Sequence, residues 1–304
     1  MTSPNVHGSA VLHSRQPTAR QLVRKVDSTE VLVADWRSVS DVQHVVTTEW
    51  PCAHSFYTAD PESHTPLLFT ESLRQALVLL SHTAFDIPLD HRLGWEYISS
   101  TITGEGLRTA AEPARVELHI THTTVNRRRQ GSSRMTAEVE AVRDGRPVGS
   151  AQLRYTSYPE AIYRRVRGHY ANAADCCARA LPPGPPADPA LVGRRNERDV
   201  VLSPTDRARV WRLRTDLTHP VLFDHPHDHI PGMVLLEAFD QAALAAGVPH
   251  RVRPLSFDTV FNRYVELNQP CLIEADVLDL STVKLVATQN DAVAASALVT
   301  VAPI

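Results

Sequence analysis

The chain has 304 residues, of which 43% are hydrophobic and 21% charged, a composition typical of one large or two ordinary folded domains and not of a disordered protein. Its formal net charge of -3 argues against a nucleic-acid-binding protein held by a global positive field. Four cysteines, two of them adjacent, are too few and too scattered for a disulfide scaffold or a zinc site.

The N-terminus, residues 1–20, is polar and contains no apolar segment of the kind that a secretory signal has. We therefore expect it to be disordered or loosely ordered. No later apolar run reaches the roughly 18–20 residues that a membrane span needs. These features predict a cytoplasmic protein that binds neither membranes nor nucleic acid.

A proline-rich segment divides the chain in two. Leu181–Pro189 contains five prolines and one glycine in nine residues, which neither a helix nor a central strand tolerates. The sequence therefore predicts one unit over residues 21–180, a linker at 181–190 and a second unit over 191–304.

The two halves resemble each other. Val23–Val33 and Val192–Leu202 share a valine, a basic pair, an acidic residue seven positions after the valine and three apolar residues. Phe69–Ala76 and Leu235–Ala242 match at Glu, Gln and Ala with identical spacing. The offset is 169 residues for the first match and 166 for the second, which indicates one small insertion or deletion. Two such blocks in the same order predict a duplicated fold.

Each half has the same coarse order of elements. An extended segment comes first, and apolar residues at helical spacing then predict a helix, over 67–84 in one half and 233–246 in the other. Strands follow, with Asp144–Gly145 as a hairpin turn. The predicted strands cover 137–142, 149–155, 272–278 and 283–287. The order favours an α+β unit in which an antiparallel sheet curls around one long helix.

Pro231–Ala242 resembles the central-helix motif of the hotdog-fold dehydratases that act on β-hydroxyacyl carrier proteins. In that family a histidine-bearing loop precedes a Pro-Gly turn, and the helix carries a catalytic acid followed four residues later by Gln. Glu237 and Gln241 occupy these two positions. His225 is the candidate for the loop histidine, but its spacing is two residues shorter than in the family, so His229 is an alternative.

The whole chain, from about residue 20 onward, more closely resembles the A-factor biosynthesis (AfsA-like) family of actinobacteria. This resemblance implies a double hotdog fold and no cofactor. It also implies an acyltransferase that condenses a β-ketoacyl thioester, delivered on acyl carrier protein, with the hydroxyl of dihydroxyacetone phosphate. This would be the first committed step towards a γ-butyrolactone, butenolide or furan signalling molecule. The matching stretches are Glu49–Tyr57, Pro66–Gln75, Val192–Ser203 and Thr218–Gln241.

The residues of the second half suit this chemistry. Acyl transfer needs a base, donors for the tetrahedral oxyanion and an apolar slot. The Pro231–Gly232 turn leaves free N–H groups at the positive end of a helix dipole. Glu237, oriented by Gln241 one turn later, should have a raised pKa in so apolar a helix, and Glu237→Ala should abolish turnover with the fold intact. Alternatively, Glu237 is a structural acid paired with an arginine.

The first half carries a similar set of polar residues, for which two uses are open. Glu71 and Gln75 are candidates for a second catalytic pair, and the helix could equally be a degenerate one that is merely packed, because no Pro-Gly turn precedes it. Arg74 and His54 are candidates for substrate binding, and Tyr57 for substrate binding or core.

The sequence leaves open the roles of the histidine loop and of several arginines. His225, His227 and His229 alternate with acids like metal ligands, but the spacing is weak evidence in a loop, and we expect no metal. A phosphate-bearing acceptor needs cations, for which Arg74, Arg92 and the Arg-rich segments 127–129 and 164–167 are candidates. Such segments are also ordinary in an Arg-biased chain, although a basic rim could guide an acidic carrier protein.

Two other functions compete with the acyltransferase. One is a dehydratase or thioesterase acting on acyl thioesters, and the other is a non-catalytic acyl-ligand-binding protein. The sequence also leaves open the acyl chain length, which repeat holds the working site, and whether the protein is a monomer or a homodimer.

Overall fold

The computed structural model describes residues 20–304. Arg20 begins the short helix α1 (Arg20–Val23), and residues 1–19 of the predicted loosely ordered segment lie outside the described residues. No helix within the described part of the chain has both the length and the apolar character needed to cross a membrane.

The first repeat forms one half of a large antiparallel sheet that curls around the helix α2 (Leu67–Thr83). The turn predicted at Asp144–Gly145 joins two long strands, and both residues have the positive φ that a tight hairpin turn requires. The strands of the sheet are β1 (Val33–Ser38), β2 (Gln43–Trp50), β5 (Arg92–Ile102), β6 (Ala114–Arg127), β7 (Ser133–Arg143) and β8 (Arg146–Tyr158), and a separate pair, β3 (Thr58–Asp60) and β4 (Ser63–His64), precedes the helix.

The second repeat has the same order of elements around the helix α5 (Gly232–Gly247). Its strands are β9 (Leu202–Pro204), β10 (Val210–Leu213), β11 (Val252–Phe261), β12 (Leu272–Val277), β13 (Thr282–Gln289) and β14 (Ala292–Pro303). The spatial order β1-β2-β6-β7-β8-β5 in the first half is matched, from the opposite edge, by β9-β10-β12-β13-β14-β11. The duplication expected from the sequence is therefore present in the topology.

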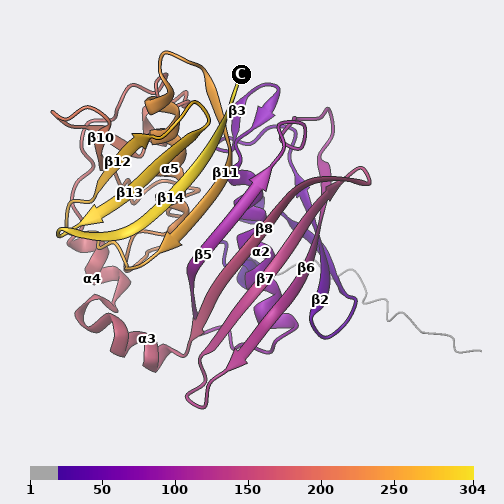
Figure 1. Cartoon of the computed structure of the whole chain (residues 1–304). Coiled ribbons are helices and arrows are strands. Elements are labelled where there is room, and N and C mark those ends of the chain that lie inside the picture. The colour runs from indigo at the N-terminus through magenta and orange to yellow at the C-terminus, as the bar shows by residue number, and fades with distance from the viewer. Residues whose placement is uncertain (1–19) are drawn as a thin grey trace, which may run out of the picture.

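The two halves join into one 12-stranded sheet through β5 and β11, which lie side by side in the middle of Figure 1. These strands pair antiparallel, with Tyr97 opposite Val260 and Thr101 opposite Ser256. Backbone hydrogen bonds thus connect the repeats, and the two helices lie on the same side of the sheet (Figure 1).

Both central helices are buried around most of their circumference, as predicted for helices that a sheet wraps. From Leu67 to Ser81 only Arg74 of α2 is not fully buried, and in α5 every residue from Met233 to Ala243 is buried. A helix surrounded on all sides has no polar face, which explains its nearly continuous apolar sequence. The α+β double hotdog fold is confirmed.

The connection between the repeats begins earlier than the proline-rich segment. After β8 ends at Tyr158, the chain forms α3 (Glu160–Arg167), the short 3-10 turn η2 (Gly168–Tyr170) and α4 (Ala173–Ala178). The proline-rich segment then bonds to the second repeat, where the Leu181 N–H donates to the Leu267 carbonyl at 2.9 Å.

Candidate active site

A cavity of about 430 Å³ opens where the two repeats meet; we call it the interface cavity. Its wall comes from α2 and β5 of the first repeat, from the loop before α5 and the end of β11 in the second, and from the connecting segment. Its volume is typical of a small-molecule site. The apolar part of the wall consists of Leu77, Val78, Leu93, Trp95, Tyr155, Ile230, Met233, Leu235, Phe261 and Val265.

Helix α5 begins at this wall with the predicted Pro231–Gly232 turn. No side chain caps the helix, and no acceptor within residues 20–304 is bonded to the N–H groups of Gly232 and Met233. A Cβ at Gly232 would lie 3.2 Å from the Trp95 ring, so glycine allows the helix to approach this close to β5. Two unsatisfied donors at the positive end of a helix dipole therefore sit on residues of the cavity wall.

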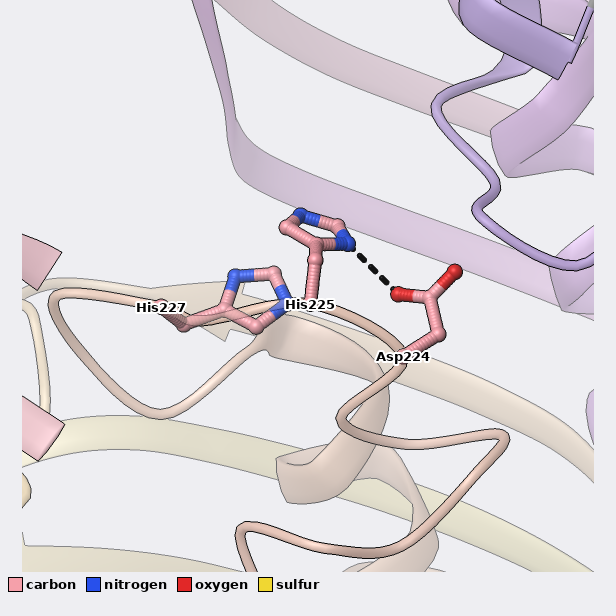
Figure 2. Close-up of side chains that lie close together, drawn as sticks. All are labelled: Asp224, His225 and His227. Atoms are coloured by element: carbon pink, nitrogen blue, oxygen red, sulfur yellow. Dashed lines mark hydrogen bonds and ion pairs between the residues drawn. The ribbon is translucent and has the colours of Figure 1, made fainter. Parts of the chain in front are cut away.

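The loop before α5 contains a hydrogen-bonded Asp–His pair, Asp224 and His225. Their Oδ1 and Nδ1 atoms are 2.6 Å apart (Figure 2), and the second carboxylate oxygen of Asp224 accepts the Val26 N–H at 3.2 Å. Burial acts to raise the pKa of Asp224, but the hydrogen bond from His225 and the charge of Lys25 outweigh it, and the pKa is lowered. Asp224 is therefore a carboxylate that holds the proton on Nδ1 of His225, which leaves Nε2 as the basic atom.

His227 lies next to this pair, with its ring centroid 4.1 Å from that of His225 (Figure 2). Burial, and then the neighbouring histidines His225 and His229, lower the pKa of His227 to about 3, so its ring is neutral near pH 7. The ligand atoms of Asp224, His225 and His227 lie within 4.8 Å of one another, and these donor types suit a divalent metal. Arginines line the same cavity, however, and their charges oppose a cation there.

A second Asp–His pair follows in the same loop. Oδ1 of Asp228 is 2.7 Å from Nδ1 of His229, and the Tyr163 hydroxyl from α3 donates to the same carboxylate. Arg167 donates to Asp228 at 3.0 Å and to Glu266 at 2.7 Å, so α3 is tied to the loop. Burial raises the pKa of Asp228, but the bond from His229 and the nearby charges lower it to well below its usual value.

Glu237 and Gln241 do not line the interface cavity. The Arg194 guanidinium donates to both oxygens of Glu237, with Nε 2.8 Å from Oε1, and Gln241 donates to Oε1 at 2.6 Å. Gln241 also bonds the backbone of Asp199 and Val201. The structure thus has the arginine-paired acid that was the alternative prediction from the sequence. These contacts attach the segment before β9, which we call an arm, to α5. A catalytic role for Glu237 and Gln241 stays a prediction.

Glu71 and Gln75 make the equivalent contacts in the first repeat and also lie outside the cavity wall. Lys25 lies 3.2 Å from Glu71, and Gln75 bonds Glu71 and the backbone of the arm before β1. We call the contacts that attach an arm to the central helix of each repeat a helix lock. Lys25 and Arg194 are 169 positions apart, so the two helix locks are related by the duplication. Burial would raise the pKa of Glu71, but Arg74 and Lys25 lower it to about 2.

Asp240, a further acid in α5, was not singled out from the sequence. Burial, together with the negative charge of Glu237, raises the pKa of Asp240 to about 7. The side chain is buried and, within residues 20–304, its Oδ1 atom has no hydrogen-bond partner.

His54 and Tyr57 are buried in the first repeat and do not line the interface cavity. Nδ1 of His54 accepts two backbone N–H groups at 3.1 Å, and Nε2 lies 3.3 Å from Glu30. His219, 165 positions later, makes the same contacts in the second repeat, with Asp199 in place of Glu30. Both histidines thus anchor loops. The offsets of 169, 165 and 166 also mean that length changes occurred on both sides of this histidine. The prediction of a single insertion or deletion between the matching blocks was therefore wrong.

Of the ten catalytic and substrate-binding residues predicted from the sequence, four line the interface cavity: His225, His229, Gly232 and Arg74. Of the other residues considered there, His227, Arg92 and Pro231 line it as well. Sequence reasoning missed Tyr163 and Arg24, which also line it. The Asp–His doublet, which occurs twice within six residues, was a usable signal for the two pairs. No local signal marks Tyr163, because its partner Asp228 lies 65 positions away.

Comparisons with known proteins agree with this architecture. The model of the A-factor biosynthesis hotdog domain matches residues 9–159 and 178–304, one match for each repeat. A protein of Streptomyces virginiae named 2-oxo-3-(phosphooxy)propyl 3-oxoalkanoate synthase is 37% identical over 260 residues, which cover 85% of this chain and 87% of the relative. A Streptomyces griseus protein of the same name is 32% identical over 86% of both chains.

Among solved structures the likeness is one of fold alone. An acyl-ACP thioesterase from Bacteroides thetaiotaomicron matches 85% of this chain and 98% of its own, with 12% identity and a TM-score of 0.54. A 12:0-ACP thioesterase from Umbellularia californica matches 86% and 98%, with 11% identity and a TM-score of 0.51. Given the family matches in both repeats and the 37% identity over most of two chains, this protein belongs to the A-factor biosynthesis hotdog family.

Proposed function

We propose that the protein is an acyltransferase that joins a β-ketoacyl group to the free hydroxyl of dihydroxyacetone phosphate. The relatives at 32–37% identity carry a name that describes a synthase of this phosphorylated ester. The observation that carries the proposal is the start of α5, where two unpaired amides and a basic histidine line one cavity between apolar walls.

His225 is the general base in this proposal. Nδ1 is held by Asp224, so Nε2 accepts the proton of the acceptor hydroxyl as its oxygen attacks the thioester carbonyl. This arrangement of a carboxylate behind an imidazole fixes the tautomer of the ring and stabilises the imidazolium that forms. Positioned bases of this kind contribute about 10²–10⁴ in rate.

The amides of Gly232 and Met233 stabilise the negative oxygen of the tetrahedral intermediate. They are donors with no competing acceptor within the described residues, and one donor to such an oxyanion contributes about 10²–10³ in kcat. The acyl chain extends along the apolar wall, beside Trp95 and Phe261, whose ring centroids are 6.1 Å apart.

His225 also serves as the proton donor of the second half of the reaction. When the intermediate collapses, the bond between the carbonyl carbon and sulfur breaks, the ester forms and the thiolate leaves. The His225 imidazolium returns to the thiolate the proton that it took from the hydroxyl, and the His229 ring, held by Asp228 and Tyr163, forms part of the same cavity wall.

The donor in this proposal is the acyl group of an acyl carrier protein. Arg128 and Arg129 in the β6–β7 loop and Arg164 and Arg165 on α3 are exposed. The two segments adjoin, since a Cβ at Gly131 would lie 3.1 Å from Pro159, and α3 carries Tyr163 of the cavity wall. A basic rim beside the cavity complements the acidic surface typical of carrier proteins.

The test is mass spectrometry of products after the protein is mixed with a β-ketoacyl carrier protein and dihydroxyacetone phosphate. The proposal predicts a phosphorylated β-ketoacyl ester and stoichiometric release of the carrier thiol. Free β-keto acid, formed equally fast with and without the triose, would identify a thioesterase instead. An unchanged thioester that stays bound would identify an acyl-binding protein.

A further inference from the structure

Three arginines converge at the first-repeat side of the interface cavity: Arg24, Arg74 and Arg92. Their side chains are linked through the backbone. Arg24 donates to the carbonyl of His91, next to Arg92, and Arg74 donates to the carbonyl of Val23, next to Arg24, at 3.3 Å. The three guanidinium groups, which come from residues far apart in the sequence, thus occupy one region of the wall.

Arg24 differs from the other two because no carboxylate in the described part of the chain pairs with it. Arg74 donates to Glu71 through two nitrogens, at 2.8 and 2.7 Å, and Arg92 lies 3.4 Å from Glu160. Within residues 20–304, Arg24 makes no ion pair, although it is largely buried. Burial, with the charges of Arg92 and Arg74, lowers the pKa of Arg24 to about 10. An anion is therefore the missing partner.

The balance of charge around the cluster points the same way. Glu71 is one carboxylate between two cations, Lys25 and Arg74, so this group keeps a net positive charge to which Arg24 adds another. Asp224, whose charge also acts on Arg74, is hydrogen-bonded to His225. A dianion would neutralise the surplus.

The duplication shows that the cluster is not a requirement of the fold. The counterparts of Arg24 and Arg74, 169 and 166 positions later, are Gly193 and Asp240. Both Arg24 and Gly193 have a positive φ, 54° and 66°, a backbone conformation that favours glycine. The first repeat thus has an arginine at a position where glycine would be less strained, on the wall of the cavity.

We infer that Arg24, together with Arg74 and Arg92, forms a phosphate subsite that binds the phosphoryl group of the triose acceptor. This inference rests on the proposed function. Arginine forks match the oxygens of a phosphate, and a dianion fits the surplus charge. With the phosphate fixed there, the far hydroxyl of the triose extends towards the histidines of the second repeat, which line the same cavity.

The test compares Arg24→Gln with the wild type, using dihydroxyacetone phosphate and unphosphorylated dihydroxyacetone as acceptors. The preference for the phosphorylated acceptor, measured as a ratio of kcat/KM values, should fall about 10- to 100-fold, the usual effect of losing a hydrogen bond to a charged group. Arg24→Lys, which keeps the charge without the fork, should lose less. Arg146→Gln, at an exposed arginine that begins β8, is the matched control and should keep the ratio.

The donor offers a second phosphate, in the phosphopantetheine arm of a carrier protein. The same variants are therefore assayed with a carrier-bound donor and with an N-acetylcysteamine thioester, which has no phosphate. If Arg24→Gln changes the preference between donors and leaves the preference between acceptors intact, the subsite binds the donor arm and our assignment is overturned.

A binding measurement separates this inference from the proposed function. Inorganic phosphate should raise the melting temperature of the wild type and of Arg146→Gln, and should not raise that of Arg24→Gln. If no acceptor yields an ester but this difference is seen, the proposed function fails and the anion subsite stands. If the wild type and Arg24→Gln respond equally to phosphate, the subsite does not exist.

Discussion

The starts of the two central helices have different surroundings although they occupy equivalent places in the two repeats. At the start of α2, His64, Thr65 and Leu67 are buried, and none of them lines the interface cavity. At the start of α5, Pro231 and Gly232 are only half-buried and form part of the cavity wall. The start of α2 is thus enclosed as core, and the start of α5 lies at the cavity wall.

The repeats also divide the polar groups of the site between them. The first repeat contributes the cations Arg24 and Arg74, and the second contributes the Asp224–His225 and Asp228–His229 pairs. Neither repeat contains a complete set. The duplication has therefore produced a composite candidate site. A symmetric dimer of identical subunits would instead have two such sites, each made of the same residues.

The largest effect should come from removing the base that only the second repeat has. His225→Gln should lower kcat by about 10²–10⁴, because Gln cannot accept the hydroxyl proton. Steady-state kinetics of the ester-forming reaction measures this. His119→Gln, at a partly exposed histidine of β6 in the first repeat, is the matched control and should keep kcat. Unchanged turnover in His225→Gln would remove the Asp224–His225 pair from the mechanism.

The helix lock should prove structural in both repeats. Glu237→Ala leaves the Arg194 guanidinium buried without its partner and should lower the free energy of unfolding by about 3–5 kcal/mol, contrary to the expectation from sequence that the fold stays intact. Denaturant unfolding measures this loss.

A double replacement sharpens the comparison. Arg194→Met combined with Glu237→Leu removes both charges and should recover much of the lost stability. If the double variant is folded yet inactive, Glu237 has a catalytic role after all. An active double variant would restrict it to holding the arm.

The exchange of Arg74 for Asp240 between the repeats predicts a pH-dependent difference in stability. Because the folded pKa of Asp240 is raised to about 7 from 3.8, the folded protein keeps a proton that the unfolded chain releases between these values, and stability falls as pH rises through that window. Asp240→Asn lacks this loss. It should be more stable than the wild type by on the order of 1–4 kcal/mol at pH 8 and not at pH 4.

Thermal unfolding across this pH range checks the prediction. Asp276→Asn on β12, an exposed residue, is the control and should show no such divergence. If the two curves of wild type and Asp240→Asn run parallel from pH 4 to pH 8, Asp240 does not hold the extra proton.

The smallest effect should be that of a chelator. In our account Asp224 and His225 act in proton transfer without a metal, so EDTA should leave turnover unchanged, and excess Zn²⁺ should inhibit by occupying Nε2 of His225. Loss of activity in EDTA that Zn²⁺ restores would show that the cluster works as a metal site.

Most of the fold could be predicted because its signals are local or repeated. Apolar residues at helical spacing marked α2 and α5 to within about one residue at each end. The Asp144–Gly145 turn marked the β7–β8 hairpin. The matching blocks in the two halves marked the duplication, although β5 and β11, which join the repeats, gave no signal of their pairing.

The site was predicted less completely because its partners are distant in sequence. The sequence placed Glu237 and Gln241 on the same face of the helix, and the two side chains are hydrogen-bonded. The further partner of the carboxylate is Arg194, which lies 43 positions earlier and had no local signal. Arg24 was read as part of a basic pair. Only the fold separates it from Lys25, whose ammonium turns inward to Glu71 while Arg24 lines the cavity.

The most direct test is a crystal structure of the protein soaked with a non-cleavable β-ketoacyl pantetheine analogue. We expect the thioester-like carbonyl oxygen within hydrogen-bonding distance of the Gly232 and Met233 amides, with the acyl chain along Trp95 and Phe261 in the interface cavity. Density for the analogue at the start of α2 instead, or with its carbonyl turned away from α5, would contradict the account.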